Sequence, residues 1–594
     1  IGEVPPQRWD WREIYGDPQA QPGKTRIKWG GFVADADCFD ARFFGISPAE
    51  AEAMDPQLRM FIETVWAALE DAGCRPASLA GSKTGVFVGV ATADYKELLN
   101  AARSRGAIDS PVEPFPFMIA NRISYLFDFH GPSEVIDTAC SSSLIAINRA
   151  VESLRLGNCQ LALAGGVSLI GSPRITIASS QAGMLSEDGR CMSFDARANG
   201  YVRSEGTAVL LLKPLAQALA DQDRIHGLIR SSGENHGGRS ASPTAPNAVA
   251  QKDLLVEVYS RAGIDPRSVS YIEAHGTGTA LGDPVEANGL KAAFAELYRR
   301  QLLPQPAQVH CGLGSVKANL GHMEAAAGAA GVIKVLLMLR HGRIPGNPQL
   351  HTPNPYLQLD DSPFYLVAAT HDWAHSEAAG QRLPRRAGVS SFGVGGSNAH
   401  VVIEEYLAAR IPPEATITDG SAAQRAAGII VLSAKNPDAL RRRARQLLDF
   451  TRRQPPALAD LAYTLQCGRE AMSHRLAFQA TSLAELQHKL GAFIDDGSSP
   501  GTVLWQGQVR QDEAGLHLLA ADGDMQATLA ASLAQGKYDK LLPAWSNGLH
   551  IHWQPFYVQQ RPRRIGLPPY PFLRARHWVP ATALTAAPAP PAPP

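Results

Sequence analysis

Cysteine is scarce in this sequence, and the cysteines that occur are scattered. The 594 residues contain seven, and no two of them form a CxxC pair. An odd and dispersed set of cysteines does not build a disulfide framework or a structural zinc site, and it is typical of proteins in a reducing compartment. We therefore expect a cytoplasmic protein with neither disulfides nor a metal site.

An excess of one charge and a long apolar run are also missing. Lys and Arg number 56, Asp and Glu number 56, and the formal net charge is zero. Binding to nucleic acid or to an anionic membrane usually needs a basic excess. The best candidate for a membrane span, residues 325–339, contains Lys334 and is shorter than the roughly 18 residues required. The first residues, "IGEVPPQRWDW", do not have the pattern of a signal peptide. The sequence predicts a soluble protein that binds neither nucleic acid nor membrane.

Strand and helix patterns alternate over residues 1–405. Residues 50–73 have the amphipathic period of a helix, and residues 84–90 and 161–170 are apolar runs of strand length. Residues 387–405 predict a strand, a glycine turn and a second strand. Alternation of this kind is typical of an α/β fold with a largely parallel, buried sheet.

A second, smaller α/β unit is predicted at residues 428–545. It is preceded by residues 406–427, which contain Pro, Ala, Thr and Gly without periodicity and indicate a linker. Within the unit the sequence predicts a strand at 474–482 and helices at 437–453, 457–466 and 483–495.

The last residues predict no further packed unit. Residues 546–580 include "RRIGLPPYPFLRARHWVP", a stretch rich in Pro, Arg and aromatic residues that we expect to lie over a surface. Residues 581–594 form an Ala/Pro-rich tail that is expected to be extended.

Cys140 lies between a strand pattern and a helix pattern, in "VIDTACSSSLIAI" (135–147). It is either a small buried filler or a nucleophile at a helix N-terminus, where backbone N–H groups and the helix dipole lower the pKa of a thiol. Position alone favours the filler, because free cysteine is usually buried and inert.

Two histidines change this balance. His275 and His322 each follow a predicted strand and open a Gly-rich loop before a helix, which is where α/β folds place their functional sites. A lone histidine is more often a hydrogen-bonded core residue. Two at equivalent positions, with Cys140 at a third, favour a catalytic set. A metal site of the same three residues is the alternative, although no short-range ligand pair supports it.

Three motifs carry a resemblance to a known family. "DTACSSSL" (137–144), "EAHGTGTALGDPVEA" (273–287) and "KANLGHMEAAAG" (317–328) resemble the active-site motifs of β-ketoacyl synthases, in particular the ketosynthase domains of modular polyketide synthases. "GMLSEDGRCMSFDARANGYVRSEG" and "SSFGVGGSNAH" are similar to that family too. The resemblance covers residues 1–405.

The resemblance implies a fold as well as an activity. The expected fold class is α/β, with a thiolase-like duplicated α/β/α/β/α layered fold over residues 1–405. Residues 428–545 would be the small α/β adapter domain that flanks such a ketosynthase, and residues 546–580 would wrap back onto it. The sequence begins at "IGEVPPQRWDW", without the strand that opens the N-terminus of family members.

The family mechanism assigns a role to each matching residue. Cys140 would carry the acyl chain as a thioester, and the backbone N–H groups of Cys140 and Phe392 would form the oxyanion hole. His275 and His322 would donate hydrogen bonds to the enolate that forms when a malonyl extender loses CO2. Lys317 would orient the site; the alternative for this residue is a surface cation.

Three further residues match family positions around the catalytic set. Glu324 would support the site by pairing with Lys317. Thr277 and Thr279 would contact the pantetheine arm, although "GTGT" equally suits a tight turn.

The resemblance also implies partners. No cofactor is expected on this chain, since the substrates ride on the phosphopantetheine of acyl carrier protein. Family members are homodimers, so we expect a homodimer. No GxSxG elbow occurs, and too few residues separate "VLSAK" (431–435) from "RARHW" (574–578) to hold an acyltransferase. This arrangement resembles a trans-acyltransferase synthase, in which a separate acyltransferase loads the extender, with the adapter domain as its possible docking site.

The leading hypothesis is therefore a decarboxylative Claisen condensation that elongates an acyl chain. A branching module that supports a Michael-type addition needs the same groups and stays open. A non-elongating scaffold that only transfers acyl chains is disfavoured by the presence of His322 and Lys317. A Cys-His hydrolase is the weakest alternative, because no third orienting residue shows a hydrolase-like context.

Overall fold

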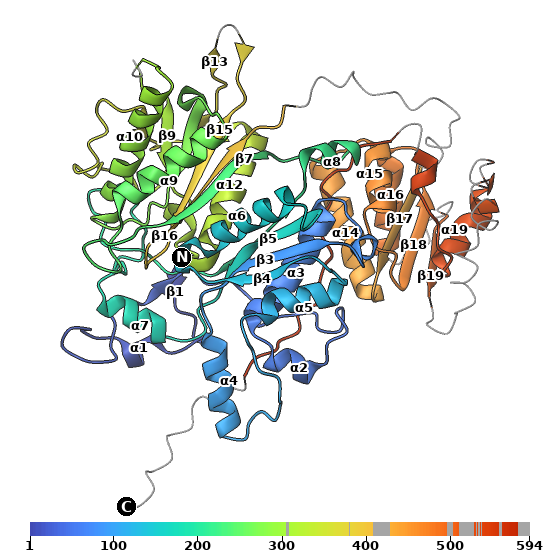
Figure 1. Ribbon diagram of the computed structural model, residues 1–594. Coiled ribbons are helices and arrows are strands. Elements are labelled where there is room, and N and C mark those ends of the chain that lie inside the picture. The colour runs from blue at the N-terminus through green and yellow to red at the C-terminus, as the bar shows by residue number, and fades with distance from the viewer. Residues whose placement is uncertain are drawn as a thin grey trace, which may run out of the picture.

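The structure is a computed structural model, shown in Figure 1. It describes residues 1–304, 308–378, 381–407, 428–495, 503–509, 537–557 and 561–579, with short pieces at 528–529, 531–532 and 535. The predicted linker 406–427, from residue 408 on, and the predicted tail 581–594 lie outside the described residues.

Four strands form the first sheet. They are β3 (Thr84–Gly89), β4 (Ser133–Ile136), β5 (Leu161–Ser168) and β6 (Gly206–Leu212), in the order β4-β3-β5-β6. β3 is parallel to β4 and β5, whereas β6 is antiparallel to β5. Every residue of β3 and β5 is buried, because layers cover both faces of the sheet.

Six strands form the second sheet. Its order is β11-β9-β8-β15-β16-β7. The strands are β7 (Leu228–His236), β8 (Val269–Glu273), β9 (Cys311–Gly314), β11 (Phe364–Leu366), β15 (Arg386–Phe392) and β16 (Ser397–Glu404). β15 and β16 are the predicted strand, glycine turn and strand of residues 387–405, and they pair antiparallel.

The two sheets repeat one topology. β9-β8-β15-β16 has the order and the strand directions of β4-β3-β5-β6. The second sheet continues with β7, antiparallel to β16, while in the described residues the first sheet ends at β6. This repetition confirms the predicted duplication.

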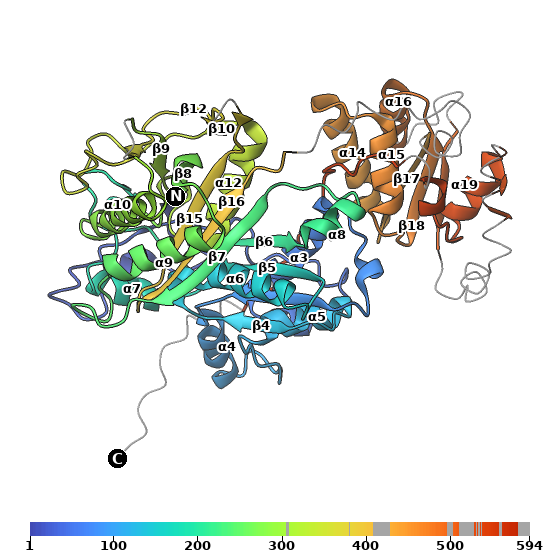
Figure 2. The same cartoon turned by 45° about the horizontal axis from the view of Figure 1, so that its top comes forward.

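Helices complete five layers, which can be followed in Figures 1 and 2. Helices α6 (Ser142–Arg155) and α12 (Ala327–His341) lie between the sheets and contact each other. The outer layers are α3 (Pro56–Asp71) and α5 (Met118–Phe127) on the first sheet, and α9 (Ala248–Arg261) and α10 (Gly282–Arg300) on the second.

Short elements connect these layers. The helices are α1 (Trp11–Ile14), α2 (Pro48–Ala53), α4 (Asp94–Ser104), α7 (Arg174–Gln181), α8 (Leu215–Ala220) and α11 (Lys317–Leu320). The 3₁₀ turns are η1 (Pro76–Leu79), η2 (Ala139–Ser141), η3 (Pro266–Ser268), η4 (Glu324–Ala326) and η5 (Gln554–Tyr557). The remaining strands are β1 (Gly2–Glu3), β2 (Trp29–Gly30), β10 (Arg343–Ile344), β12 (His371–Asp372), β13 (Glu377–Ala378) and β14 (Gln381–Arg382).

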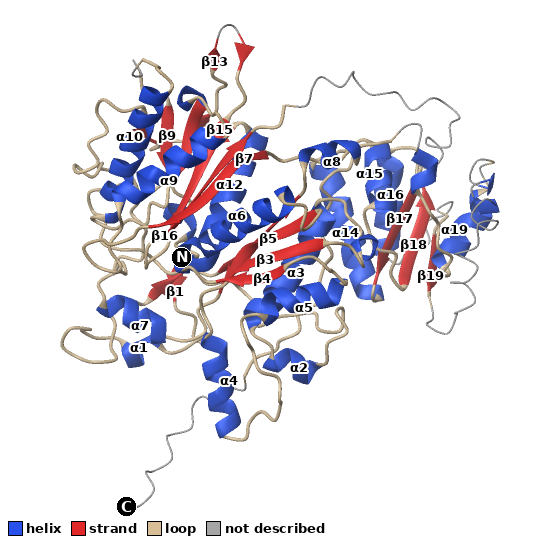
Figure 3. Cartoon of the chain, in the orientation of Figure 1, coloured by secondary structure: helices blue, strands red, loops and turns tan. Residues whose placement is uncertain are grey.

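The C-terminal unit has an antiparallel sheet of its own, seen in red at the right of Figure 3. The sheet is β17 (Ile429–Ala434), β18 (His474–Gln479) and β19 (Trp505–Gln508), and the helices are α14 (Pro437–Arg453), α15 (Leu458–Cys467), α16 (Leu483–Ile494) and α19 (Tyr538–Ser546). α14 has the predicted bounds: the Asn436 side chain accepts from the Ala439 N–H, and Pro437 occupies the first position. Among the helices of the described ranges, none has the length and apolar character to span a bilayer.

One buried carboxylate connects this unit to residues 1–405, the layered part of the chain. Glu70, in the last turn of α3, is fully buried and accepts a hydrogen bond from Arg443 of α14 at 3.0 Å. The guanidinium of Arg469 lies 3.6 Å away, and the Tyr570 N–H donates to the second carboxylate oxygen at 2.6 Å. Three separate parts of the chain thus share this carboxylate.

The segment after residue 560 lies along residues 37–44 of the layered part. The Leu573 N–H donates to the Asp40 carboxylate at 2.8 Å, and the Phe39 N–H donates to the Ala575 carbonyl at 2.8 Å. The Phe572 ring packs edge-on against the ring of Phe43. Backbone pairing and aromatic contacts therefore hold this segment, which has no regular element of its own.

We predict that Glu70→Gln lowers the free energy of unfolding by about 3 kcal/mol, because it leaves two buried guanidinium groups without a carboxylate. Denaturant unfolding of the full chain measures this change. Asp71→Asn is the matched control, since Asp71 is mostly exposed and its pair with Arg224 should contribute less than about 1 kcal/mol. Equal losses in the two variants would contradict the prediction.

Candidate active site

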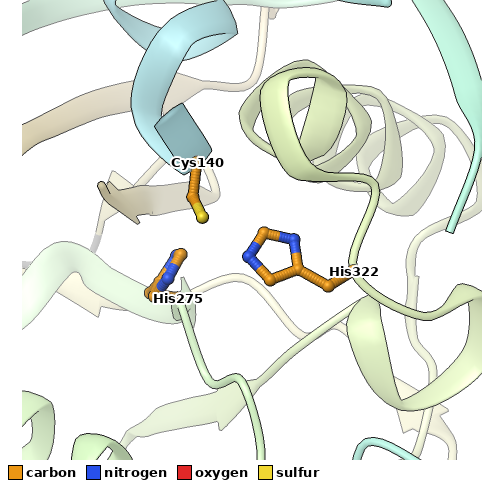
Figure 4. A group of neighbouring side chains, drawn as sticks. All are labelled: Cys140, His275 and His322. Atoms are coloured by element: carbon orange, nitrogen blue, oxygen red, sulfur yellow. The ribbon is translucent and has the colours of Figure 1, made fainter. Parts of the chain in front are cut away.

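Cys140, His275 and His322 meet between the two halves of the layered part (Figure 4). The thiol sulfur and one ring nitrogen of each histidine all lie within 4.8 Å of one another, and the two ring centroids are 5.5 Å apart. Cys140 comes from η2, before α6; His275 follows β8; His322 follows α11. The three residues predicted from the sequence are therefore neighbours in space.

A tight turn presents Cys140. Ala139 has a left-handed backbone (φ 55°), and the hydroxyl of Ser142 accepts from the Thr138 N–H at 2.9 Å. The Ser391 hydroxyl, from β15, donates to the carbonyl of Cys140 at 2.7 Å. Gly393 passes so close that a Cβ there would lie 2.2 Å from the Thr138 carbonyl oxygen. The turn is fixed from both halves of the fold.

The Cys140 thiol is protonated at neutral pH. Burial, followed by the carboxylate of Glu324, raises its pKa to about 11, and this outweighs the lowering by the Val394 N–H and by Lys317. The sequence predicted the opposite direction from the helix N-terminus. That prediction is wrong, because removing a thiolate from water costs more than the nearby dipoles return.

Both histidines carry their proton on Nε2. Nδ1 of His275 accepts from the Phe392 N–H at 3.3 Å, and Nδ1 of His322 accepts from the Glu324 N–H at 3.0 Å. A neutral imidazole whose Nδ1 accepts must be protonated at Nε2. Burial, and then the positive charge of Lys317, lower the pKa of both rings well below the usual value. Each ring is therefore a neutral N–H donor.

Nε2 of His322 is free to bind a ligand. It is buried and has no hydrogen-bond partner within the described part of the chain. A buried donor without a partner costs free energy unless another group supplies the acceptor. An oxygen of a substrate is such an acceptor.

Lys317 is a buried residue and not a surface cation. It begins α11 and is 3% exposed. Burial lowers its pKa, and the carboxylates of Glu273 and Glu286 oppose this effect. Its charge therefore acts on the site at close range.

Glu286 is a supporting residue that the sequence analysis missed. Its carboxylate accepts from the N–H groups of His275 (2.7 Å) and Gly276 (2.8 Å) and so fixes the loop that carries His275. Burial raises its pKa to about 7. The signal was an acidic residue within the motif "GDPVEA", on the helix that follows the histidine loop.

Phe392, the predicted second oxyanion donor, has its N–H directed elsewhere in the structure. The Phe392 N–H is directed to Nδ1 of His275, whereas the N–H that bonds to the Cys140 sulfur belongs to Val394. Sequence alone does not show which amide of "SSFGVGG" faces the thiol.

Glu324 also has a different partner from the one predicted. It forms a two-pronged ion pair with the buried Arg203, with Nε–Oε1 at 2.6 Å and Nη2–Oε2 at 3.0 Å. The predicted pairing with Lys317 rested on their closeness in sequence. Arg203 lies more than a hundred residues earlier and reaches Glu324 only in the fold.

The two threonines of "GTGT" contact each other. Their hydroxyl oxygens lie 3.2 Å apart, and the Thr279 hydroxyl accepts from the Gly282 N–H at 3.1 Å, where α10 begins. Both Thr277 and Thr279 are half-buried. The hydrogen bond to the Thr279 hydroxyl therefore fits a tight turn, the alternative interpretation of "GTGT".

Cys140, His275 and His322 are compact enough to be considered as metal ligands. The charge around them disfavours this interpretation, since Lys317 already lowers the pKa of both rings and would repel a second cation. The arrangement suits a half-buried nucleophile that faces two neutral N–H donors.

Comparisons with known proteins agree with this geometry. Residues 1–218 match the family model "Beta-ketoacyl synthase, N-terminal domain", and residues 226–351 match "Beta-ketoacyl synthase, C-terminal domain". Residues 431–497 match "RhiE-like, KS-MAT linker domain".

Three relatives show how far the similarity extends. The chain is 49% identical to polyketide synthase PksN of Bacillus subtilis over 99% of its own length and 11% of that protein, so it spans about a tenth of this curated relative. The solved ketosynthase from module 6 of the bacillaene synthase of Bacillus subtilis and the oxazolomycin ketosynthase domain OzmH KS7 of Streptomyces albus each share 38% identity. Each superposes with a TM-score of 0.85 over 98% of this chain and 94% of the other. The chain therefore belongs to the β-ketoacyl synthase family, as a condensing ketosynthase of modular polyketide synthases with the linker domain that follows it.

Proposed function

We propose that this chain catalyses a decarboxylative Claisen condensation between an acyl chain on Cys140 and a malonyl-type extender on acyl carrier protein. The observation that carries the proposal is the pair of backbone N–H bonds to Nδ1 of His275 and His322, which turns both Nε2–H groups into donors. Two neutral donors beside a thiol fit an enolate oxygen, which is a developing negative charge.

The acyl chain is loaded first. The Cys140 sulfur attacks the carbonyl carbon of an acyl thioester on phosphopantetheine, and the tetrahedral oxyanion accepts from the N–H groups of Cys140 and Val394. The C–S bond to pantetheine then breaks, and the pantetheine thiol leaves with the proton lost by Cys140. Because the pKa of the resting thiol is about 11, this proton must move as the bond forms.

The extender is condensed in the second step. The malonyl thioester loses CO2, and the electron pair of the broken C–C bond forms an enolate. The enolate oxygen accepts hydrogen bonds from Nε2 of His275 and of His322. The carbanion forms a C–C bond to the acyl carbon, the Cys140–acyl bond breaks, and the departing Cys140 thiolate takes a proton from water to restore the thiol. Burial, and then the charge of Lys317, keep both rings neutral, so they stay hydrogen-bond donors and do not protonate the carbanion.

Several partners follow from this proposal. Phosphopantetheine of acyl carrier protein delivers both substrates past Thr277 and Thr279, and the chain itself binds no cofactor. A homodimer is expected. A separate acyltransferase would load the extender, with residues 428–545 as a candidate docking unit, and the linker match at 431–497 supports this type of synthase.

We predict that intact-mass analysis with a simple acyl thioester shows one acyl group on the wild-type chain and none on Cys140→Ala. Addition of malonyl carrier protein should then release CO2 and give a β-ketoacyl product. Acylation without this product would contradict elongation. A product formed by addition to an enoyl thioester would indicate branching.

His322→Ala separates the two steps. We expect acylation to persist, and condensation to fall by about 10²–10³-fold, as for loss of one donor to a developing oxyanion. His130→Ala is the control, because His130 is exposed and its partner is Asp128, away from the site. An equal loss in both steps would contradict the assigned role.

Val394→Pro tests the second oxyanion donor. Removal of this N–H should slow acylation of Cys140 by about 100-fold, while Val394→Ala, which keeps the N–H, should stay close to wild type. Mass spectrometry of the acyl-enzyme over time measures the rates. Normal acylation of the proline variant would show that another amide is the second oxyanion donor.

The raised pKa of Cys140 gives a pH prediction. The thiolate fraction below the pKa rises tenfold for each pH unit, so the rate of iodoacetamide alkylation at Cys140 should climb from pH 6 to pH 9 without a plateau. Peptide mapping of the alkylated chain provides the rate. A plateau below pH 8 would show a stabilised thiolate and contradict the prediction.

A further inference from the structure

Arg203 and Glu324 form a buried ion pair behind the catalytic histidines. The side chain of Arg203 is 2% exposed and that of Glu324 is 12% exposed. The two parallel bonds are the strong bidentate geometry of guanidinium and carboxylate. The remaining Nη1 of Arg203 donates to the Thr176 hydroxyl of α7 at 2.8 Å. Arg203 is thus held at three points.

Glu324 has an uncommon backbone conformation. Its φ is 43°, in the left-handed region that costs a residue with a side chain roughly 1–2 kcal/mol. Glycine would adopt this conformation freely, yet the chain has glutamate here. A strained backbone of this kind persists only where surrounding contacts enforce it.

The turn that contains Glu324 presents an N–H to the site. The Glu324 N–H is the donor to Nδ1 of His322, at 3.0 Å. It is therefore the group that assigns the proton of His322 to Nε2. If the turn at residues 323–324 shifted, this N–H would move away from Nδ1 and the tautomer would no longer be fixed.

The backbone of Arg203 is itself paired with His322. The His322 N–H donates to the Val202 carbonyl at 2.7 Å, and the Ser204 N–H donates to the His322 carbonyl at 2.8 Å. Arg203 thus flanks the histidine through its main chain and supports the next turn through its side chain.

We infer that Arg203 is a positioning residue for condensation: its bidentate pairing anchors the strained turn at Glu324, so that the Glu324 N–H stays on Nδ1 and keeps His322 as an Nε2–H donor. The inference rests on the proposed function, in which that donor acts on the extender. Arg203 does not touch the reacting atoms. Its charge also balances a carboxylate that would otherwise face the Cys140 thiol unpaired.

The main test compares two rates in Arg203→Met, which keeps an unbranched apolar stem and removes the pairing. Acylation of Cys140 should stay within about threefold of wild type. Condensation should fall by about 10–100-fold, the range found when the group that orients a functional histidine is lost. A purely structural role would lower both rates together.

A second substitution should rescue the first. In R203M/E324G, glycine adopts the left-handed conformation without support and no buried carboxylate is left without a partner. Condensation should return to within about threefold of wild type. Failure of the rescue, in a double variant that acylates normally, would overturn the inference.

The matched control is Arg8→Met. Arg8 and Glu205 form another buried pair, at 3.0 Å, which is not hydrogen-bonded to His322. Its loss should reduce thermal stability and leave the ratio of condensation to acylation unchanged. A ratio that falls as far as in R203M would show that any broken buried pair has this effect, and would overturn the inference.

A spectroscopic readout separates this inference from the proposed function. Long-range ¹H–¹⁵N correlation on the histidine-labelled full chain, with His322 assigned by difference from His322→Ala, should show the Nε2–H tautomer in wild type and mixed tautomers in R203M. If wild type fails to condense, the proposed function fails while this test still stands. If R203M does not fold, Arg203→Lys, which keeps one charge but not two parallel bonds, takes its place. An unchanged tautomer with unchanged condensation would overturn the inference.

Discussion

Close packing of α6 against α12 is the constraint on which the site depends. The two helices lie between the sheets, and Gly328 of α12 approaches Leu144 of α6 so closely that a Cβ would lie 2.7 Å from the leucine Cβ. The Ser143 hydroxyl accepts from the Ala329 N–H at 3.0 Å, which aligns the two helix beginnings. Cys140 precedes one helix and His322 precedes the other, so this contact sets the distance between the thiol and the imidazole.

Burial then determines the charge state of the site. It raises the pKa of the Cys140 thiol and lowers the pKa of both histidines, so that the three reacting groups are neutral before substrate arrives. The permanent charges lie one step further away, on Lys317 and on the Arg203–Glu324 pair. A neutral site with charged surroundings stabilises an anion as it forms and does not bind one tightly beforehand.

The sequence predicted the layers and the meeting of Cys140, His275 and His322, because strand and helix periods and the places where strands end are local properties. It also predicted the bounds of α14, 437–453. It did not predict the Val394 donor, the Arg203–Glu324 pair or the loop support from Glu286. Each of these depends on which distant segments meet in the fold. The predicted lowering of the Cys140 pKa was wrong for the same reason. The local turn shows the helix dipole that lowers the pKa, whereas only the packed structure shows the burial that raises it.

The shared carboxylate of Glu70 has a consequence for exchanging such enzymes between synthases. One continuous apolar core joins the layered part, the C-terminal unit and the segment after residue 560. Trp66, Leu447 and Tyr570 are examples from each. A cut after residue 405, where the sequence motifs end, would expose that core and remove Arg443 and Arg469 from their partner. The smallest transplantable piece therefore extends through Val579, and its boundary is defined by cooperativity of folding and not by the catalytic motifs.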